Sequence, residues 1–144
     1  MEFRKFGNRY VIRLDKSEEV VATLKKFCQE QEITLGWITG IGAVNKAKIG
    51  LFEIGSKEYH SSVLEGNFEI TSLMGNISTM QGEVYLHLHI NLADKEHKTW
   101  GGHLNEAYIS ATGEFVIEEI KGSVEREFSS EVGLNLYKFL YNIL

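Results

Sequence analysis

From Ile33 onward, apolar and polar residues mostly alternate along the chain. A period of two is typical of β-strands, because successive side chains point to opposite faces. The alternation predicts strands over 33–38, 44–53, 58–64, 68–78, 84–93, 106–119 and 123–128. Turn residues separate most of them, at Gly55-Ser56, Glu65-Gly66, Gln81-Gly82, 94–98 and Lys121-Gly122. Short, regular connections favour an antiparallel sheet over βαβ units.

The N-terminal part predicts one further strand, over 10–14, followed by a helix that extends to about residue 31. Asp15 and Glu18 resemble a capping box at the helix start. Apolar residues then follow at helical spacing, at Val20, Val21, Leu24, Phe27 and Cys28. We expect this amphipathic helix to pack on the sheet.

Two segments depart from simple patterns. The glycines of Gly40-Ile41-Gly42 mark a bend or a close approach of two backbones. After Ser129, the tail has Val132, Leu136, Phe139 and Leu140 at the spacing of a short helix, although Gly133 and Asn135 weaken that pattern. The tail is too apolar for a solvated end, so we expect it to pack on the sheet or on a neighbouring subunit.

The 144 residues, of which 43% are hydrophobic and 24% charged, fit a single domain over 1–144. No segment approaches the roughly 20 apolar residues of a membrane helix, and the first residues lack the apolar core of a signal peptide. We therefore expect a cytoplasmic protein without membrane contact. Cys28 has no second cysteine to pair with, and its helical position predicts a core residue.

The net charge of −5 argues against DNA binding, because affinity for DNA comes largely from Lys and Arg that neutralise phosphates. The basic residues are scattered, and their densest groups are small. The chain also contains no proline, so a minor-groove hook built on Arg-Gly-Arg-Pro is absent.

The chemistry is concentrated in histidines. His87 and His89 stand on one face of the predicted strand 84–93, with Cα atoms roughly 6.6 Å apart. His103 follows soon after, and a strand reversal would bring it beside this pair. Three neutral imidazoles without a thiolate suit Zn²⁺, or another divalent transition metal, with one open position. The alternative is three half-buried, hydrogen-bonded polar residues.

The other candidates carry less chemistry. We expect His97 to be solvated and His60 to be a surface or hydrogen-bonded residue. Glu69 and Glu114 fall in strands and would most simply face solvent or an interface, although an inward carboxylate serves as a partner to a ligand or as a base. No glycine-rich cofactor loop or phosphate loop is present, and we assign no catalytic residue.

Four ordered motifs resemble the PPC domain, the plants-and-prokaryotes conserved domain, from about residue 9 to 128. They are Gly40-Ile41-Gly42-Ala43-Val44, the segment 66–76, Leu86-His87-Leu88-His89 and Gly101-Gly102-His103-Leu104. The resemblance implies an α+β fold, with a mainly antiparallel β-sheet flanked by helices, assembled as a homotrimer. It also implies a metal site, because the histidines of members with this pattern map onto His87, His89 and His103.

Two departures concern the DNA-binding label of the family, which derives from plant members fused to AT-hooks. The hook is absent here. The plant segment Gly-Arg-Phe-Glu-Ile-Leu is replaced by Gly66-Asn67-Phe68-Glu69-Ile70-Thr71, which removes an arginine and with it the basis for the plant partner interaction.

Three hypotheses follow. The first is a small, trimeric zinc-binding PPC-domain protein whose substrate the sequence does not indicate, so that an enzymatic role is left open. The second is a DNA-binding or transcription-associated protein, which requires the trimer to gather Lys and Arg on one face. The third is a trimeric protein-interaction module with a structural metal ion.

Overall fold

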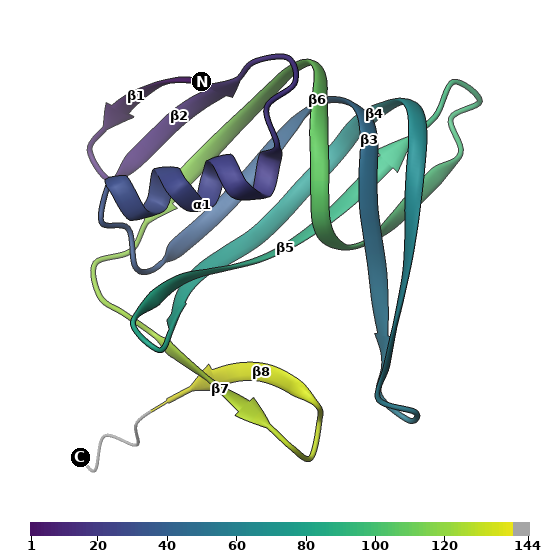
Figure 1. The fold of residues 1–144 in the computed structure, drawn as a ribbon. Helices are drawn as coiled ribbons and strands as arrows, with labels where there is room; N and C mark the ends of the chain where they lie inside the picture. The colour runs from purple at the N-terminus through teal and green to yellow at the C-terminus, as the bar shows by residue number, and fades with distance from the viewer. Residues whose placement is uncertain (140–144) are drawn as a thin grey trace.

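The computed structural model of the protein describes residues 1–139. It is built from long strands and, within these residues, one helix (Figure 1). The strands are β1 (Glu2–Phe6), β2 (Arg9–Leu14), β3 (Gly36–Glu53), β4 (Glu58–Met80), β5 (Glu83–Ala93), β6 (Thr99–Glu119), β7 (Glu125–Ser129) and β8 (Leu134–Lys138). The helix is α1 (Val20–Glu30). The described helix is too short to cross a membrane.

The strands form one sheet in the order β1-β2-β6-β3-β4-β7-β8, and β5 pairs with both β4 and β6. Since β3 also pairs with β4 and β6, the ladder β3-β4-β5-β6 closes on itself. Every pairing of these strands is antiparallel except a single parallel pair between β4 and β7. The mainly antiparallel sheet is thus confirmed. The expectation of flanking helices is corrected, because one helix covers the sheet in residues 1–139.

Helix α1 packs on one face of the sheet through its apolar stripe. Val20, Leu24, Phe27 and Cys28 are buried in the core. The helix begins later than predicted, because the Glu19 carboxylate caps it by accepting from the amides of Val21 and Ala22. The predicted capping contact does form, since the Asp15 amide donates to the Glu18 carboxylate at 2.6 Å. It closes the turn before the helix.

Strands β3 and β4 are continuous where the sequence predicted interruptions. Gly40 and Gly42 lie inside β3 and flank a shift in the register between β3 and β4. A second register shift lies just before the pair Lys46 and Glu65, next to Gly66 of β4. The predicted close approach of two backbones is confirmed at Gly42, where a Cβ atom would overlap the backbone of Thr112 and Gly113 on β6. A Cβ atom on Gly40 would overlap the Phe115 ring. The glycines therefore bend a strand without ending it.

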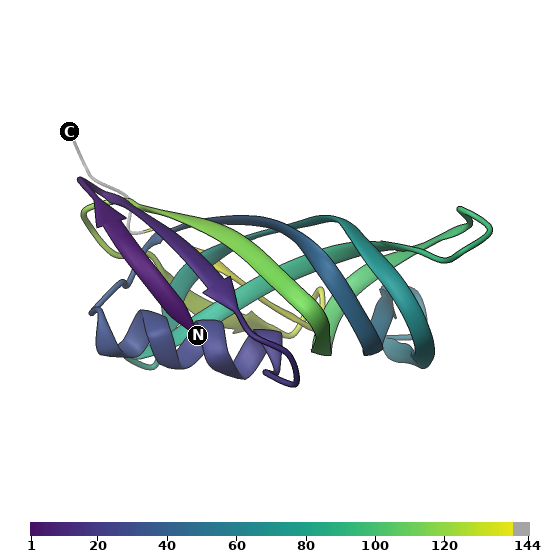
Figure 2. The ribbon, with the colours of Figure 1, turned by 90° about the horizontal axis from the view of Figure 1, so that it is seen from above.

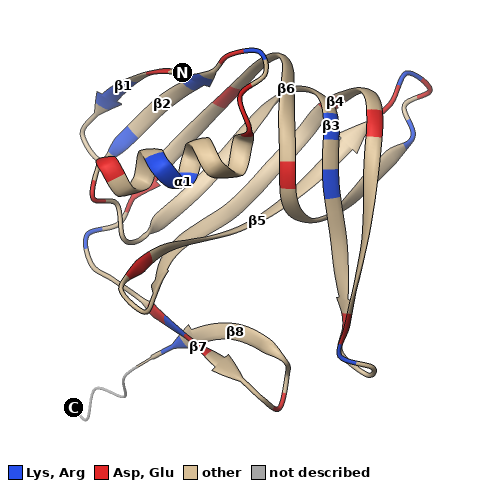
Figure 3. Ribbon diagram, in the orientation of Figure 1, with Lys and Arg blue, Asp and Glu red and all other residues tan. Residues whose placement is uncertain are grey.

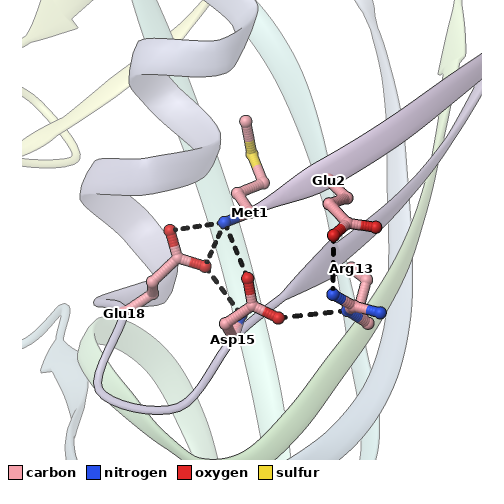
Figure 4. A network of polar contacts seen from close by, with 5 residues as sticks. All are labelled: Met1, Glu2, Arg13, Asp15 and Glu18. Atoms are coloured by element: carbon pink, nitrogen blue, oxygen red, sulfur yellow. Dashed lines mark hydrogen bonds and ion pairs between the residues drawn. The ribbon is translucent and has the colours of Figure 1, made fainter.

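The first strand, β1, was missed by the sequence analysis. It pairs with β2 and brings the Met1 amino group 3.0 Å from the Asp15 carboxylate. The same amino group lies 3.0 Å from the Glu18 carboxylate, and Arg13 links Asp15 to Glu2 (Figure 4). This network fastens the edge of the sheet to the turn before α1.

The tail forms a β-hairpin, β7–β8, and the helical alternative is wrong for the described residues. Leu140 of that pattern lies outside them. The hairpin is attached to the sheet through Arg126, which is 7% exposed. Its guanidinium donates to Ser78 and Asn76 on β4 and to the backbone of Asn135 on β8. It also stacks on Tyr85 and Tyr137.

The sheet face opposite α1 carries no helix of the described chain (Figure 2). Cross-strand partners form rows across this open face. One row runs through Val11, Val116, Thr39, Met74 and His89. Several apolar side chains of the open face are exposed, namely Val11, Trp37, Ile41, Met74 and Val116. The histidine pair stands at the β5 end of this face.

Candidate metal centre

Strand β5 positions two of the three histidines. Leu88 and Ile90 of β5 are buried in the core, so their neighbours His87 and His89 point to the open face. The predicted alternation is confirmed residue by residue in this strand. The core side chains on one face therefore fix the imidazoles on the other.

The third histidine returns on the neighbouring strand. A turn at 94–98 reverses the chain, with the Asp94 carboxylate accepting from the amides of Glu96 and Lys98. Strand β6 then pairs with β5 so that His103 stands directly opposite His89. Gly102 permits this arrangement, because a Cβ atom there would lie 2.7 Å from the carbonyl oxygen of Gly50 on β3.

The three rings face one another at short range. Ring centroids are 5.1 Å apart for His87 and His89, 5.3 Å for His87 and His103, and 5.7 Å for His89 and His103. One ring nitrogen from each lies within 4.8 Å of the others. Nitrogen ligands of a tetrahedral zinc ion lie about 3.4 Å apart, at Zn–N distances of about 2.1 Å. Small rotations of the imidazole rings would shorten the nitrogen–nitrogen distances from at most 4.8 Å to about 3.4 Å, so the three nitrogens fit one ion.

The surroundings of His87 and His103 keep these two rings in the uncharged form that binds metal. Burial, together with the neighbouring His103, Arg126 and His89, lowers the pKa of His87 to about 4. Burial and the adjacent His89 also lower the pKa of His103. At neutral pH these two imidazoles are uncharged, and each offers a nitrogen lone pair. His89 is exposed, whereas His87 and His103 are partly buried. The candidate centre is therefore open to a further ligand from solvent.

Two polar residues of β4, from opposite ends of that strand, border the site. Asn76 stands directly opposite His87 in the β4–β5 pairing, and its side-chain oxygen accepts from Arg126 at 2.8 Å. Tyr59 lies beside His103, with the two rings in a T-shaped arrangement and 6.2 Å between their centroids. The Tyr59 hydroxyl donates to the side-chain oxygen of Asn105 at 2.7 Å.

The sequence analysis missed Asn76, Arg126 and Tyr59. Each is far from the histidines along the chain and reaches them through the sheet pairing or the C-terminal hairpin. A lone Asn in a strand and an Arg in Glu125-Arg126-Glu127 carry no sequence signal for such a role. Their placement depends on tertiary structure.

The remaining candidates lie away from this centre. His97 is exposed in the 94–98 turn, and His60 is exposed beside Glu53 and Glu58, at 3.5 and 4.0 Å. These three exposed groups at the β3–β4 hairpin also cluster, and exposed acidic side chains commonly do so without a metal ion. Glu69 and Glu114 are exposed, and Cys28 is buried with its thiol pKa raised to about 12 by that burial.

Similar structures share the whole fold. A protein from Bacteroides thetaiotaomicron described as a "putative dna binding protein" is 36% identical, with a TM-score of 0.94 and 96% of each chain covered. A metal-containing protein from Archaeoglobus fulgidus is 33% identical, with a TM-score of 0.85 over 96% of this chain and 97% of that one. A PPC protein from Pyrococcus horikoshii is 34% identical, with a TM-score of 0.84 over 96% of each.

A curated relative, the bifunctional protein GlmU of a Synechococcus strain, is 29% identical over 124 residues. That match covers 85% of this chain but 18% of GlmU, so the chain spans less than a fifth of that relative. The sequence profile of the Plants and Prokaryotes Conserved (PCC) domain family matches residues 1–121. His87, His89, His103 and the strands β1 to β6 all fall inside this match, and the chain belongs to the Plants and Prokaryotes Conserved domain family.

Proposed function

We propose that this protein binds a divalent transition-metal ion, with Zn²⁺ as the principal candidate, through His87, His89 and His103. The observation that carries the proposal is the convergence of three ring nitrogens within 4.8 Å of one another on adjacent strands. Three imidazole ligands leave a tetrahedral ion one position for water or a small molecule, as in catalytic rather than structural zinc sites. The relative from Archaeoglobus fulgidus described as metal-containing supports this reading.

An ion held in this way would supply Lewis-acid chemistry, either by polarising a carbonyl group or by lowering the pKa of bound water. The chain's own contribution is to hold three ligands on a rigid sheet. The polar neighbours of these three ligands are Asn76, opposite His87, and Tyr59, beside His103. A structural ion remains the alternative role, and the same ligand set supports it.

Metal analysis tests the proposal. After purification without a histidine tag, we expect about one ion per subunit, and we expect His89→Ala to lose at least 90% of it because two imidazoles bind far more weakly than three. His60→Ala is the matched control, since His60 is an exposed strand histidine outside this centre. If the unmodified protein, produced in zinc-supplemented cells, holds less than about a tenth of an ion per subunit, the proposed three-histidine site is wrong.

We also propose that the protein assembles as a homotrimer through the open face of the sheet. Exposed apolar side chains gather there, with Val11 at 50%, Met74 at 49% and Trp37 at 43% exposure. A contiguous apolar patch on a sheet face is typical of a subunit interface. A trimer of this kind would place the histidines at the margin of the interface, because Met74 stands opposite His89.

DNA binding is the second candidate, favoured by the description of the relative from Bacteroides thetaiotaomicron. Charge weighs against it. The net charge is −5, and Lys and Arg are interleaved with Asp and Glu over many elements (Figure 3). Specific DNA binding by phosphate contacts would weaken steeply as salt rises, and retention of duplex DNA at low salt would be the first sign of it.

A further inference from the structure

The guanidinium of Arg126 is locked in place beside the candidate metal centre. It donates to the Ser78 hydroxyl at 2.7 Å, the Asn135 carbonyl at 2.8 Å and the Asn76 side-chain oxygen at 2.8 Å. Aromatic rings of Tyr85 and Tyr137 stack on it, at 4.9 and 4.3 Å from their centroids. A cation with this many partners is rigid, so the groups that it contacts are held rigidly too.

This arrangement fixes the orientation of the Asn76 amide. Arginine has donors only, so the Asn76 atom that faces Arg126 is its oxygen, and the NH₂ group points elsewhere. Arg126 also contacts Ser78 and Tyr85, which lie on the side of Asn76 away from Met74 and His89. The NH₂ group therefore lies on the side of the amide away from Arg126. Asn76 stands opposite His87, where neighbouring Cβ atoms are about 5 Å apart.

The charge of the centre favours an anion. Arg126, which is permanently charged, reaches the centre through Asn76, the residue opposite His87. Within the described residues, the candidate donor set consists of three imidazoles and contains no carboxylate. A divalent ion at this position would add two positive charges without a protein carboxylate to balance them, so an anionic exogenous ligand would neutralise part of the excess.

We propose, resting on the metal site proposed above, that the open position takes a small carboxylate. One carboxylate oxygen binds the ion, and the other accepts a hydrogen bond from the Asn76 NH₂ group that Arg126 orients. The one open coordination position and the one oriented donor match the two oxygens of a carboxylate. In this arrangement Asn76 is a binding residue, and Arg126 is a positioning residue supplied by the C-terminal hairpin.

The cobalt(II)-loaded protein provides the test, because the visible absorption of cobalt changes when a ligand enters its coordination shell. We titrate it with acetate and record the half-saturation concentration. Asn76→Asp keeps an oxygen for Arg126 but replaces the donor with a negative charge, and we expect it to raise the half-saturation concentration about tenfold or more. Arg126→Lys, which keeps the charge but not the planar fork, should raise it less.

Asn91→Asp is the matched control, since Asn91 lies on the same face of β5, two residues from His89, and is no partner of Arg126. It introduces the same charge, and we expect a change below about threefold. Cobalt content is measured for every variant. A protein that takes up no cobalt overturns the metal site itself. A cobalt-loaded protein that ignores acetate, prefers phosphate, or responds equally in Asn76→Asp and the unmodified chain overturns the carboxylate proposal alone.

Discussion

The three histidines and their polar neighbours reach the candidate metal centre by different routes. The convergence of His87, His89 and His103 follows from strand periodicity and one short turn, both of which are local properties of the chain. The positions of Asn76 and Arg126 follow from strand pairing and from the docking of a distant hairpin. Local patterns carry no information about such pairings, so the cluster of three histidines could be predicted and its polar neighbours could not.

At the residue scale, the network of Figure 4 predicts a pH dependence of stability. Hydrogen bonds to Glu18 and then Asp15 raise the pKa of the Met1 amino group above 8.0. The hydrogen bond with that amino group is the largest influence lowering the pKa of Asp15 below 3.8. The amino group stabilises the fold below pH 8.0 and loses this effect as pH rises through its raised pKa. Asp15 stabilises it above pH 3.8 and loses the effect as pH falls through its lowered pKa.

Asp15→Asn should therefore lower the melting temperature most between those limits and should make the pH profile flatter than that of the unmodified protein. The effect is small, because the groups are solvent-accessible and salt screens them. Thermal unfolding at several pH values measures it. Glu131→Gln, at an exposed position outside the network, is the control. Parallel profiles for all three proteins would show that the network does not stabilise the fold.

Elements were predicted best where alternation was strict. Strand β5 matches its predicted range within a residue, and the turns at 81–82 and 94–98 are where the sequence placed them. Strands β3 and β4 were predicted as separate pieces, because a glycine in a strand resembles a turn signal. Whether it ends the strand depends on the partner strands, which here continue through the irregularity. The tail was ambiguous for a related reason, since apolar residues near Gly133 fit either a short helix or a hairpin.

The bend in β3 yields a prediction at the scale of the element. A methyl group at position 40 would overlap the Phe115 ring and approach the Glu114 carbonyl within 2.9 Å. Gly40→Ala should therefore destabilise the protein by about 1–3 kcal/mol, because the core ring and the strand must both shift. Urea unfolding measures this change.

Gly55→Ala is the matched control, since a Cβ atom at that turn position meets nothing within 4 Å. We expect a change within about 0.5 kcal/mol there. Equal unfolding midpoints for the two variants would mean that β3 can move away from β6 at no cost, which would contradict the close approach described for this bend.

In the molecule as a whole, α1 covers one face of the sheet and leaves the other face open. A substitution on the open face tests whether the trimer forms through it. Val116 lies on the open face and is 38% exposed. Val116→Lys would bury a charge in the proposed interface, which is costly without a partner, so we expect the trimer to dissociate. Sedimentation should then give the mass of one chain for this variant and of three for the unmodified protein.

Val63→Lys provides the control, because Val63 is 51% exposed but lies on the long β3–β4 hairpin, away from the row of side chains around Met74. It should leave the trimer intact. A monomeric unmodified protein, or a trimer that survives Val116→Lys, would show that the open face is not the site of self-association.

All three candidate ligands lie on one β-hairpin, formed by β5 and the start of β6. The donor set is therefore complete as soon as this hairpin closes, before the distant parts of β3 and β4 need to meet. A slip of one residue between β5 and β6 would turn the imidazoles of one strand away from those of the other. An ion captured at that early stage would select the correct strand alignment, and the metal would then act as a guide for folding as well as a centre for chemistry.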